Sequence, residues 1–142
     1  MQKRTALFVC SLRWRFEFCF ANWRGTGAVV LMTDKVVVLV TCETAKQARR
    51  IARALVEARL AACGNVLEAP VRSIYRWKGK VESAREYLLI IKTSRRRFAA
   101  LRDTVKRLHS YDVPEIIALP IAAGSAEYLR WIDACVAGSG RS

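Results

Sequence analysis

Hydrophobic residues change their spacing along the chain, and these changes separate strands from helices. Val36–Val40 is an unbroken aliphatic run, which predicts a strand that is covered on both faces. Thr44, followed three residues later by Gln47, fits the capping box that opens a helix. Beyond this box, apolar residues recur every three or four positions while basic residues occupy the other side. The pattern predicts a helix from Thr44 to about Leu60.

The middle of the chain predicts a hairpin. Cys63–Leu67 is a short apolar stretch that ends before a proline, and Val71–Trp77 then alternates like a strand, with Val71, Tyr75 and Trp77 on one face where packing is expected. Lys78-Gly79 suits the tip of a tight turn, because glycine accepts a positive φ. A return strand is expected from Val81 to Ile91, where its end is apolar on both faces.

The last third of the chain repeats the alternation of helix and strand. It predicts a helix from about Ser94 to Leu108, a strand over Glu115–Ile121, and a final helix from Ser125 to about Cys135. The whole order is strand, helix, strand, strand, helix, strand and a terminal helix. This order is typical of an α+β ferredoxin-like sandwich with a C-terminal helix.

The regular patterns begin only after the first 31 residues. Residues 1–31 are aromatic and apolar but show no sustained period, so we expect an N-terminal extension that is disordered or not part of the core. Charged side chains interrupt this segment, which therefore lacks the ~20 consecutive apolar residues of a membrane span. The predicted domain covers residues 32–137, and residues 138–142 form a frayed tail.

The positive net charge of the chain makes polyanions candidate partners. With 25 Lys and Arg against 12 Asp and Glu, the formal net charge is +13. RNA-recognition domains share the predicted topology, but they carry stacking aromatics on the third strand. Lys78–Glu82, the stretch that comes nearest to that motif, has none, so nucleic acid is not expected as a partner. Most of the surplus charge falls on helix faces and on Arg95–Arg97.

The cysteines and the single histidine limit the available chemistry. The five cysteines include no CxxC pair, which argues against a zinc ribbon and favours a reducing cytoplasm. No catalytic or phosphate-binding motif occurs, so an enzyme is not expected. His109 could ligate copper or zinc together with Cys42 or Cys63 and a carboxylate such as Glu115. With one histidine per chain, a complete site would draw on two or three subunits.

Six stretches of the sequence carry a family pattern. Two are specific: Ser73–Val81, which contains Ile-Tyr-Arg-Trp-Lys-Gly-Lys, and His109–Ile116, which contains His-Ser-Tyr-Asp-Val-Pro-Glu. The others are Val36–Thr41, Arg59–Val66, Leu88–Thr93 and Tyr128–Ile132. Together, from about Met32 to Ala134, they resemble the CutA family of divalent-cation-tolerance proteins.

The resemblance implies a cytoplasmic homotrimer in which the hairpin strands pair across subunits. It implies tolerance and binding of copper or another divalent metal, with no obligatory cofactor and no catalysis. His109 matches a histidine proposed as a ligand in some members, whereas the family's cysteine position corresponds to Val40 here, two residues before Cys42. The candidate metal site is His109, Cys42 and Glu115, and whether Cys42 substitutes for the family cysteine is left open by the sequence.

The resemblance also implies a cleft between subunits near the metal residues, with Trp77, Lys92 and Tyr111 as its neighbours. An alternative function on the same trimer is a regulator that binds a small anion or nucleotide, by analogy with PII-type signalling proteins. That regulator would use Lys92 and the arginine run Arg95–Arg97.

Overall fold

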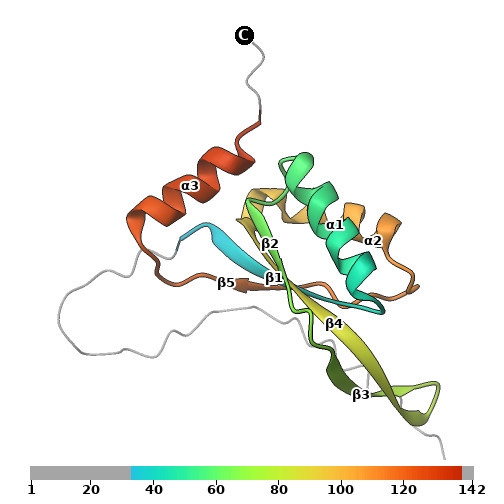
Figure 1. Cartoon of the computed structure of the whole chain (residues 1–142). Coiled ribbons are helices and arrows are strands. Elements are labelled where there is room, and N and C mark those ends of the chain that lie inside the picture. The colour runs from blue at the N-terminus through green and yellow to red at the C-terminus, as the bar shows by residue number, and fades with distance from the viewer. Residues whose placement is uncertain (1–32, 139–142) are drawn as a thin grey trace, which may run out of the picture.

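The computed structural model describes residues 33–138, and the predictions for the N-terminal extension and most of the tail lie outside these residues. The strands are β1 (Lys35–Cys42), β2 (Cys63–Val66), β3 (Val71–Trp77), β4 (Lys80–Ser94) and β5 (Ile117–Pro120). The helices are α1 (Ala45–Glu57), a 3-10 turn (Arg95–Arg97), α2 (Phe98–Leu108) and α3 (Ala126–Val136). Figure 1 shows α1 and α2 side by side against the sheet, with α3 set apart from them.

The sheet has the predicted topology. Its strands lie in the order β2-β4-β1-β5, and β3 pairs with the first half of β4. Since β2 and β3 follow one another along the same partner strand, the arrangement is the antiparallel sheet of a ferredoxin-like sandwich with two helices on one face. The α+β fold with a C-terminal helix is thereby confirmed.

The strand β1 lies at the centre because it is apolar on both faces. It pairs antiparallel with β4 from Lys35↔Ser94 to Cys42↔Tyr87, and with β5 on its other side. Its alternate residues from Val36 to Cys42 are buried beneath α1 and α2. The observed strand is two residues longer at its C-terminal end than the aliphatic run predicts, which brings Cys42 into the sheet.

The first helix starts as predicted and ends earlier. Thr44 accepts a hydrogen bond from the Gln47 amide, as the capping box predicts, whereas the Gln47 side chain accepts its return bond from the amide of Glu43, one residue before the cap. The helix stops at Glu57, three residues before the predicted end, because Arg59 adopts a left-handed conformation with φ 53°. The amide of Leu60 then bonds the carbonyl of Leu55, which makes a Schellman cap without the usual glycine.

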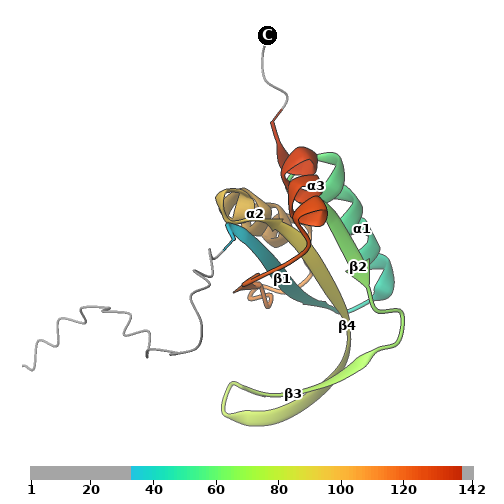
Figure 2. The ribbon, with the colours of Figure 1, turned by 90° about the vertical axis from the view of Figure 1, so that its left-hand side faces the viewer.

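The hairpin of β3 and β4 projects beyond the rest of the domain as a long curved arm (Figures 1 and 2). Trp77 pairs with Lys80 across a two-residue turn in which Lys78 and Gly79 have φ of 46° and 82°. Positive φ at both turn positions is the type I′ geometry that suits the twist of a hairpin. The expected packing of Tyr75 and Trp77 is not completed within the chain, since they remain 42% and 45% exposed.

The remaining boundaries differ from the prediction at strand ends and helix starts. Ser94 belongs to β4 and is buried, and the predicted helix begins instead with the 3-10 turn before α2. The strand β5 covers only Ile117–Pro120, four residues instead of seven, because only these pair with β1. The terminal helix α3 starts after Ser125 and ends at Val136, close to the predicted span.

Opposite α1 and α2, the sheet is only partly covered by α3 (Figure 2). The α3 side chains of Ile132 and Val136 pack on Ala62, and Lys35 holds the helix by an ion pair with Asp133 at 2.9 Å. Burial lowers the pKa of Lys35, but the carboxylates of Asp34 and Asp133 outweigh it and leave the pKa raised. This contact therefore ties α3 to the central strand with a charged lysine.

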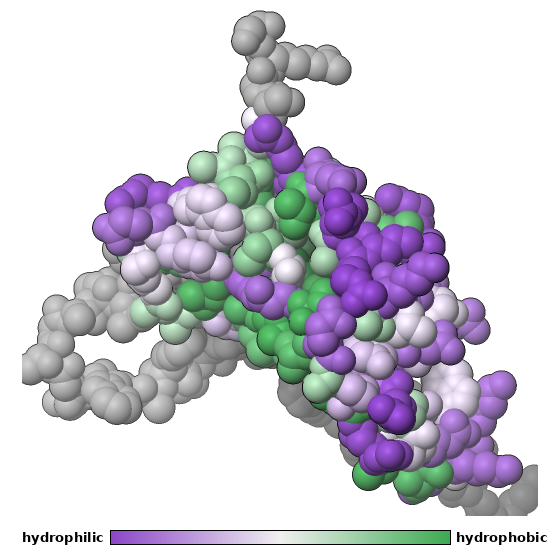
Figure 3. Space-filling view, in the orientation of Figure 1, coloured by the Kyte–Doolittle hydropathy of each residue, from purple (hydrophilic) through white to green (hydrophobic). Residues whose placement is uncertain are grey.

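The uncovered part of that sheet face is apolar. Its side chains come from three strands and are half-buried or exposed: Val37, Leu39, Leu88, Ile90, Ile117 and Leu119. Figure 3 shows hydrophobic side chains gathered between α3 and the foot of the hairpin. We call these six residues the open sheet face. Apolar side chains gathered in this way are typical of an interaction surface.

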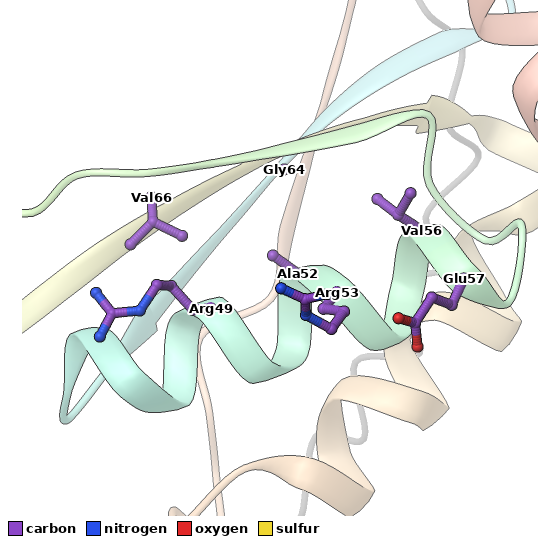
Figure 4. A pocket seen from close by; sticks show the side chains of 7 residues that line it. All are labelled: Arg49, Ala52, Arg53, Val56, Glu57, Gly64 and Val66. Atoms are coloured by element: carbon purple, nitrogen blue, oxygen red, sulfur yellow. The ribbon is translucent and has the colours of Figure 1, made fainter.

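The helix α1 approaches β2 closely at Gly64. A Cβ at this position would lie 3.0 Å from the Cβ of Ala52 and 3.3 Å from Cδ1 of Leu89. Gly64 thus forms the floor of an open groove of about 450 Å³ that runs between α1 and β2 (Figure 4). The absence of a side chain, rather than a special backbone angle, is what the packing requires here.

We therefore predict that Gly64→Ala destabilises the protein by about 1–3 kcal/mol, because a methyl group would be forced into a packed contact. Urea denaturation followed by circular dichroism measures the change. The double variant Gly64→Ala/Ala52→Gly removes the opposing Cβ. It should lose less stability than the sum of its two single variants, and strict additivity would contradict the proposed contact.

Candidate functional site

His109 lies at the C-terminal end of α2, where the backbone leaves the helix in an extended conformation. Its ring Nε2 lies 2.9 Å from the carbonyl oxygen of Thr41, and its Nδ1 accepts a hydrogen bond from the Tyr111 amide at 3.0 Å. Since a carbonyl oxygen can only accept, Nε2 carries the proton and the ring is the neutral Nε2–H tautomer. Both nitrogens are therefore engaged within the chain.

The bond to Thr41 places His109 beside the end of β1. Ser110 adds a second link, because its hydroxyl donates to Glu43 at 3.2 Å. The rings of His109 and Tyr111 lie 5.0 Å apart at a tilt of 56°. The segment after α2 is thus attached to the three residues that end β1 and lead to α1, and histidine, tyrosine and carboxylate groups meet there.

Glu86 is a buried carboxylate in this neighbourhood. It is 6% exposed, and its charge acts from β4 on both Tyr111 and Cys42. Burial, the Glu86 charge and a hydrogen bond to Glu86 raise the pKa of Tyr111 to about 12, with a smaller contribution from Glu43. Tyr111 is consequently a neutral phenol near the Glu86 carboxylate at any physiological pH.

Cys42 is fully buried on the helix-covered side of β1. Burial, reinforced by the nearby Glu86 charge, raises the pKa of its thiol to about 11. A thiol in this state is a poor nucleophile, because the reactive species is the thiolate. A metal ion could still bind its sulfur, but it would have to displace the proton.

The structure brings His109 and Cys42 to the same end of β1, since the His109 ring binds the carbonyl of the residue directly before Cys42. Glu115 lies four residues beyond Tyr111, half-buried in the segment leading to β5. Within residues 33–138, no group of three or more His, Cys, Asp and Glu side chains is arranged to hold a metal ion. The site of His109, Cys42 and Glu115 stays a prediction.

The predicted cleft residues occupy three separate places in one chain. Trp77 lies at the tip of the β3–β4 hairpin, whereas Tyr111 lies next to Glu86 after α2. Lys92 pairs with Cys63 in the other half of β4, and its ammonium donates to the side chain of Asn65. These three residues therefore form no common cleft within one chain, and the cleft between subunits stays a prediction.

The alternative anion site also lacks a common centre. The Lys92 ammonium is directed toward β2, and Arg97 donates from Nε and a terminal nitrogen to the carbonyl oxygen of Val136 at 2.9 and 2.6 Å. Arg97 therefore fixes the end of α3 instead of lining a pocket with Lys92. No contact between described residues favours the anion-binding regulator.

Sequence patterns did not identify Glu86 and Glu43 as members of this site. Glu86 is the last charged residue before the apolar end of β4, and a carboxylate at such a border is usually exposed. Its burial follows from the register Cys42↔Tyr87 and from the segment that returns after α2. A single sequence does not specify either of these tertiary contacts.

Comparison with known proteins gives a consistent result. The model of the family described as "CutA1 divalent ion tolerance protein" matches residues 36–135. The divalent-cation tolerance protein CutA of Thermus thermophilus is 53% identical over 96 residues, which cover 68% of this chain and 92% of that protein. The chloroplastic CutA of Arabidopsis thaliana is 44% identical over 97 residues, covering 68% of this chain and 53% of that protein.

Solved structures show the same fold. The structure titled as the periplasmic divalent cation tolerance protein CutA from Archaeoglobus fulgidus superposes with a TM-score of 0.70 at 43% identity. The match covers 72% of this chain and 99% of the archaeal chain. The similarity thus extends over the described domain from β1 to α3.

The raised pKa of Tyr111 gives a direct prediction. An absorbance titration of the phenolate, taken as the difference between the parent and Tyr111→Phe, should give a midpoint of about 12 instead of 10.0. Since the folded protein keeps this proton where the unfolded chain loses it, the stability that Tyr111 contributes should fall as the pH rises between these two values.

Glu86→Gln should move this midpoint down toward 10.0, because the negative charge beside the phenol is removed. Glu82→Gln serves as the matched control, since Glu82 is an exposed carboxylate on the same strand. A parent midpoint near 10.0, or an equal shift in the control, would contradict the described contact.

Proposed function

The chain belongs to the CutA divalent-cation tolerance family, and from this premise we propose that it is a homotrimeric, non-catalytic protein that binds copper or another divalent metal. The observation that carries the proposal is that His109 binds the end of β1 next to Cys42 and the Glu86 charge, in a chain that matches the family over residues 36–135.

Copper suits the donors at this end of the sheet. Imidazole and thiolate ligands favour copper among the divalent first-row ions, and carboxylates complete mixed sites. In our proposal the protein ligands are His109, Cys42 and Glu115, with Glu86 and Glu43 as neighbouring carboxylates that offset the charge of the cation. Burial of Cys42 makes binding pH-dependent, because its proton must leave as the metal enters.

His109 must exchange a hydrogen bond for a metal bond. Its Nδ1 lone pair is occupied by the Tyr111 amide, so a metal ion at Nδ1 would displace the segment that follows α2. This displacement would also move Tyr111 relative to Glu86. Metal binding and the position of this segment are therefore coupled in our proposal.

The state of the ionisable groups supports binding rather than catalysis. The thiol of Cys42 has a pKa of about 11 and the phenol of Tyr111 one of about 12. The His109 ring is engaged at both nitrogens. A general base or nucleophile needs a pKa near the working pH and a free lone pair, and none of these three groups has both.

Two features support the homotrimer. The open sheet face carries Ile117 and Leu119 at 46% and 47% exposure, and such apolar area is unusual on a free surface. The β4 segment Lys80–Glu86 pairs only with β3, so one of its edges lacks a strand partner among residues 33–138. A neighbouring copy would cover the face and pair with the edge, as self-association of open strands commonly does.

A cytoplasmic location is the remaining part of the proposal. Cys42, Cys63 and Cys135 are free thiols, which suits a reducing compartment. No helix among the described residues is long and apolar enough to cross a membrane. Chloroplastic and periplasmic names occur among the relatives, so compartment differs within the family.

Calorimetric titration with copper tests the metal site. His109→Ala and Cys42→Ala should each weaken binding about 10–100-fold, the loss expected when a metal site is deprived of an ordering group or ligand. Cys63→Ala is the matched control, since this half-buried thiol contacts Tyr128 far from His109 and should leave the affinity unchanged. Binding that is absent in the parent, or equal in parent and both variants, would contradict the metal proposal.

Sedimentation of the full chain tests the assembly. We expect a species of three chains of 16.0 kDa each. The double variant Ile117→Lys/Leu119→Lys should dissociate it, because charged side chains would enter the interface. Val56→Lys, at an equally exposed valine on α1, should remain trimeric. A monomeric parent, or a double variant that still sediments as three chains, would contradict the proposed use of this face.

A further inference from the structure

The outer surface of the two-helix layer is strongly basic. The helix α1 has four basic residues and one acidic residue, the 3-10 turn consists of three arginines, and α2 has three basic residues and one acidic residue. Every basic residue of these three elements is exposed except Arg97. The exposed ones are Lys46, Arg49, Arg50, Arg53, Arg95, Arg96, Arg102, Lys106 and Arg107. Figure 3 shows hydrophilic side chains spread over this layer. We call it the basic helix face.

These cations belong to one continuous surface. The helices lie side by side, and Arg50 of α1 donates a hydrogen bond to the carbonyl of Leu108 at the end of α2. On α1, the positions 46, 49, 50 and 53 follow the spacing of a single helical side, opposite buried Ala48, Ile51 and Leu55. The cations of α1 and α2 therefore share the outer side of the two-helix layer.

Few carboxylates neutralise this face. Arg49 is paired with Glu68 at 2.8 Å, and Arg102 is paired with the adjacent Asp103 at 2.8 Å. Both pairs are exposed, so water and salt weaken them and an incoming anion can compete for the guanidinium groups. In Figure 4, Arg49, Arg53 and Glu57, the one acidic residue of α1, line the groove in this order along the helix.

Apolar side chains are almost missing from the same face. Val56, 41% exposed, is the one large hydrophobic residue of α1, the 3-10 turn and α2 that is exposed. Stable attachment to a membrane needs apolar insertion or a lipid chain in addition to charge. Single-stranded nucleic acid is usually held by stacking on aromatic side chains, which this face does not offer.

We propose that the basic helix face binds the phosphate backbone of double-stranded nucleic acid without sequence preference. Such binding needs only cations on a surface that follows the duplex, because release of counterions supplies the free energy. With 13 residues, α1 is about 20 Å long, a span over which a duplex carries more than ten phosphate charges at ~1.7 Å each. Arginine also suits phosphate, since its fork can donate two parallel hydrogen bonds.

This proposal goes beyond metal tolerance and uses a different part of the molecule. The open sheet face and the metal residues are not part of the basic helix face. A trimer built on the sheet side would therefore leave the basic helix face accessible. The missing aromatics on the third strand argue against recognition of single-stranded RNA by the sheet. They do not bear on a duplex that contacts the helices.

The test is a titration of the full chain with a fluorescein-labelled duplex DNA of about 20 base pairs and arbitrary sequence, followed by anisotropy at several salt concentrations. We expect the logarithm of the binding constant to fall linearly with the logarithm of the salt concentration. A second duplex of unrelated sequence should bind with equal affinity. Arg53→Glu/Lys106→Glu should weaken binding about tenfold or more and reduce the magnitude of the salt slope by about 2, for two lost phosphate contacts.

The matched control is Arg130→Glu/Lys80→Glu, which makes the same change in net charge away from the helix layer, on exposed positions of α3 and the hairpin. It should bind the duplex nearly as well as the parent. Equal weakening in both double variants would show that net charge alone acts and would overturn the proposal. Binding to phosphatidylserine vesicles with none to the duplex would also overturn it.

Discussion

The antiparallel pairing of β1 with β4 is the constraint on which the rest of the structure depends. Because the register runs from Lys35↔Ser94 to Cys42↔Tyr87, one set of alternate residues enters the core under α1 and α2 and the other set forms the open sheet face. The same register ends β1 beside Glu86 and leaves the β4 segment Lys80–Glu86 to extend as an arm with β3. A slip of one residue would reverse every side chain of β1 and destroy both the core and the site.

Three residues of reactive types, Cys42, His109 and Tyr111, lie near the end of β1, and the surrounding structure lowers their reactivity. Burial holds the proton on Cys42, burial together with the Glu86 carboxylate holds the proton on Tyr111, and two backbone groups occupy the ring of His109. In this state none of the three side chains is a free base or nucleophile. Our proposal places the cation at this end of the strand, where it would have to displace the thiol proton and break one backbone contact of His109.

Local patterns predict the fold where one residue type decides the outcome. The aliphatic run of β1, the Thr44 capping box and the Lys78-Gly79 turn each specify their element, and together they define the order of the sandwich. The sequence patterns do not predict helix ends or buried charges that depend on tertiary contacts. Arg59 closes α1 in a conformation usually given to glycine, and Glu86 is buried only because distant segments meet around it. His109 was recognisable as a candidate, but its hydrogen bonds to Thr41 and Tyr111 depend on how α2 ends against β1.

X-ray absorption at the copper edge of the copper-loaded full chain tests the central claim, that the donors at the end of β1 bind the cation. We predict a first coordination shell with one sulfur ligand together with nitrogen or oxygen ligands, and the loss of the sulfur contribution in Cys42→Ala but not in Cys63→Ala. A shell made only of nitrogen and oxygen ligands in the parent, or a sulfur contribution that survives in Cys42→Ala, would contradict it.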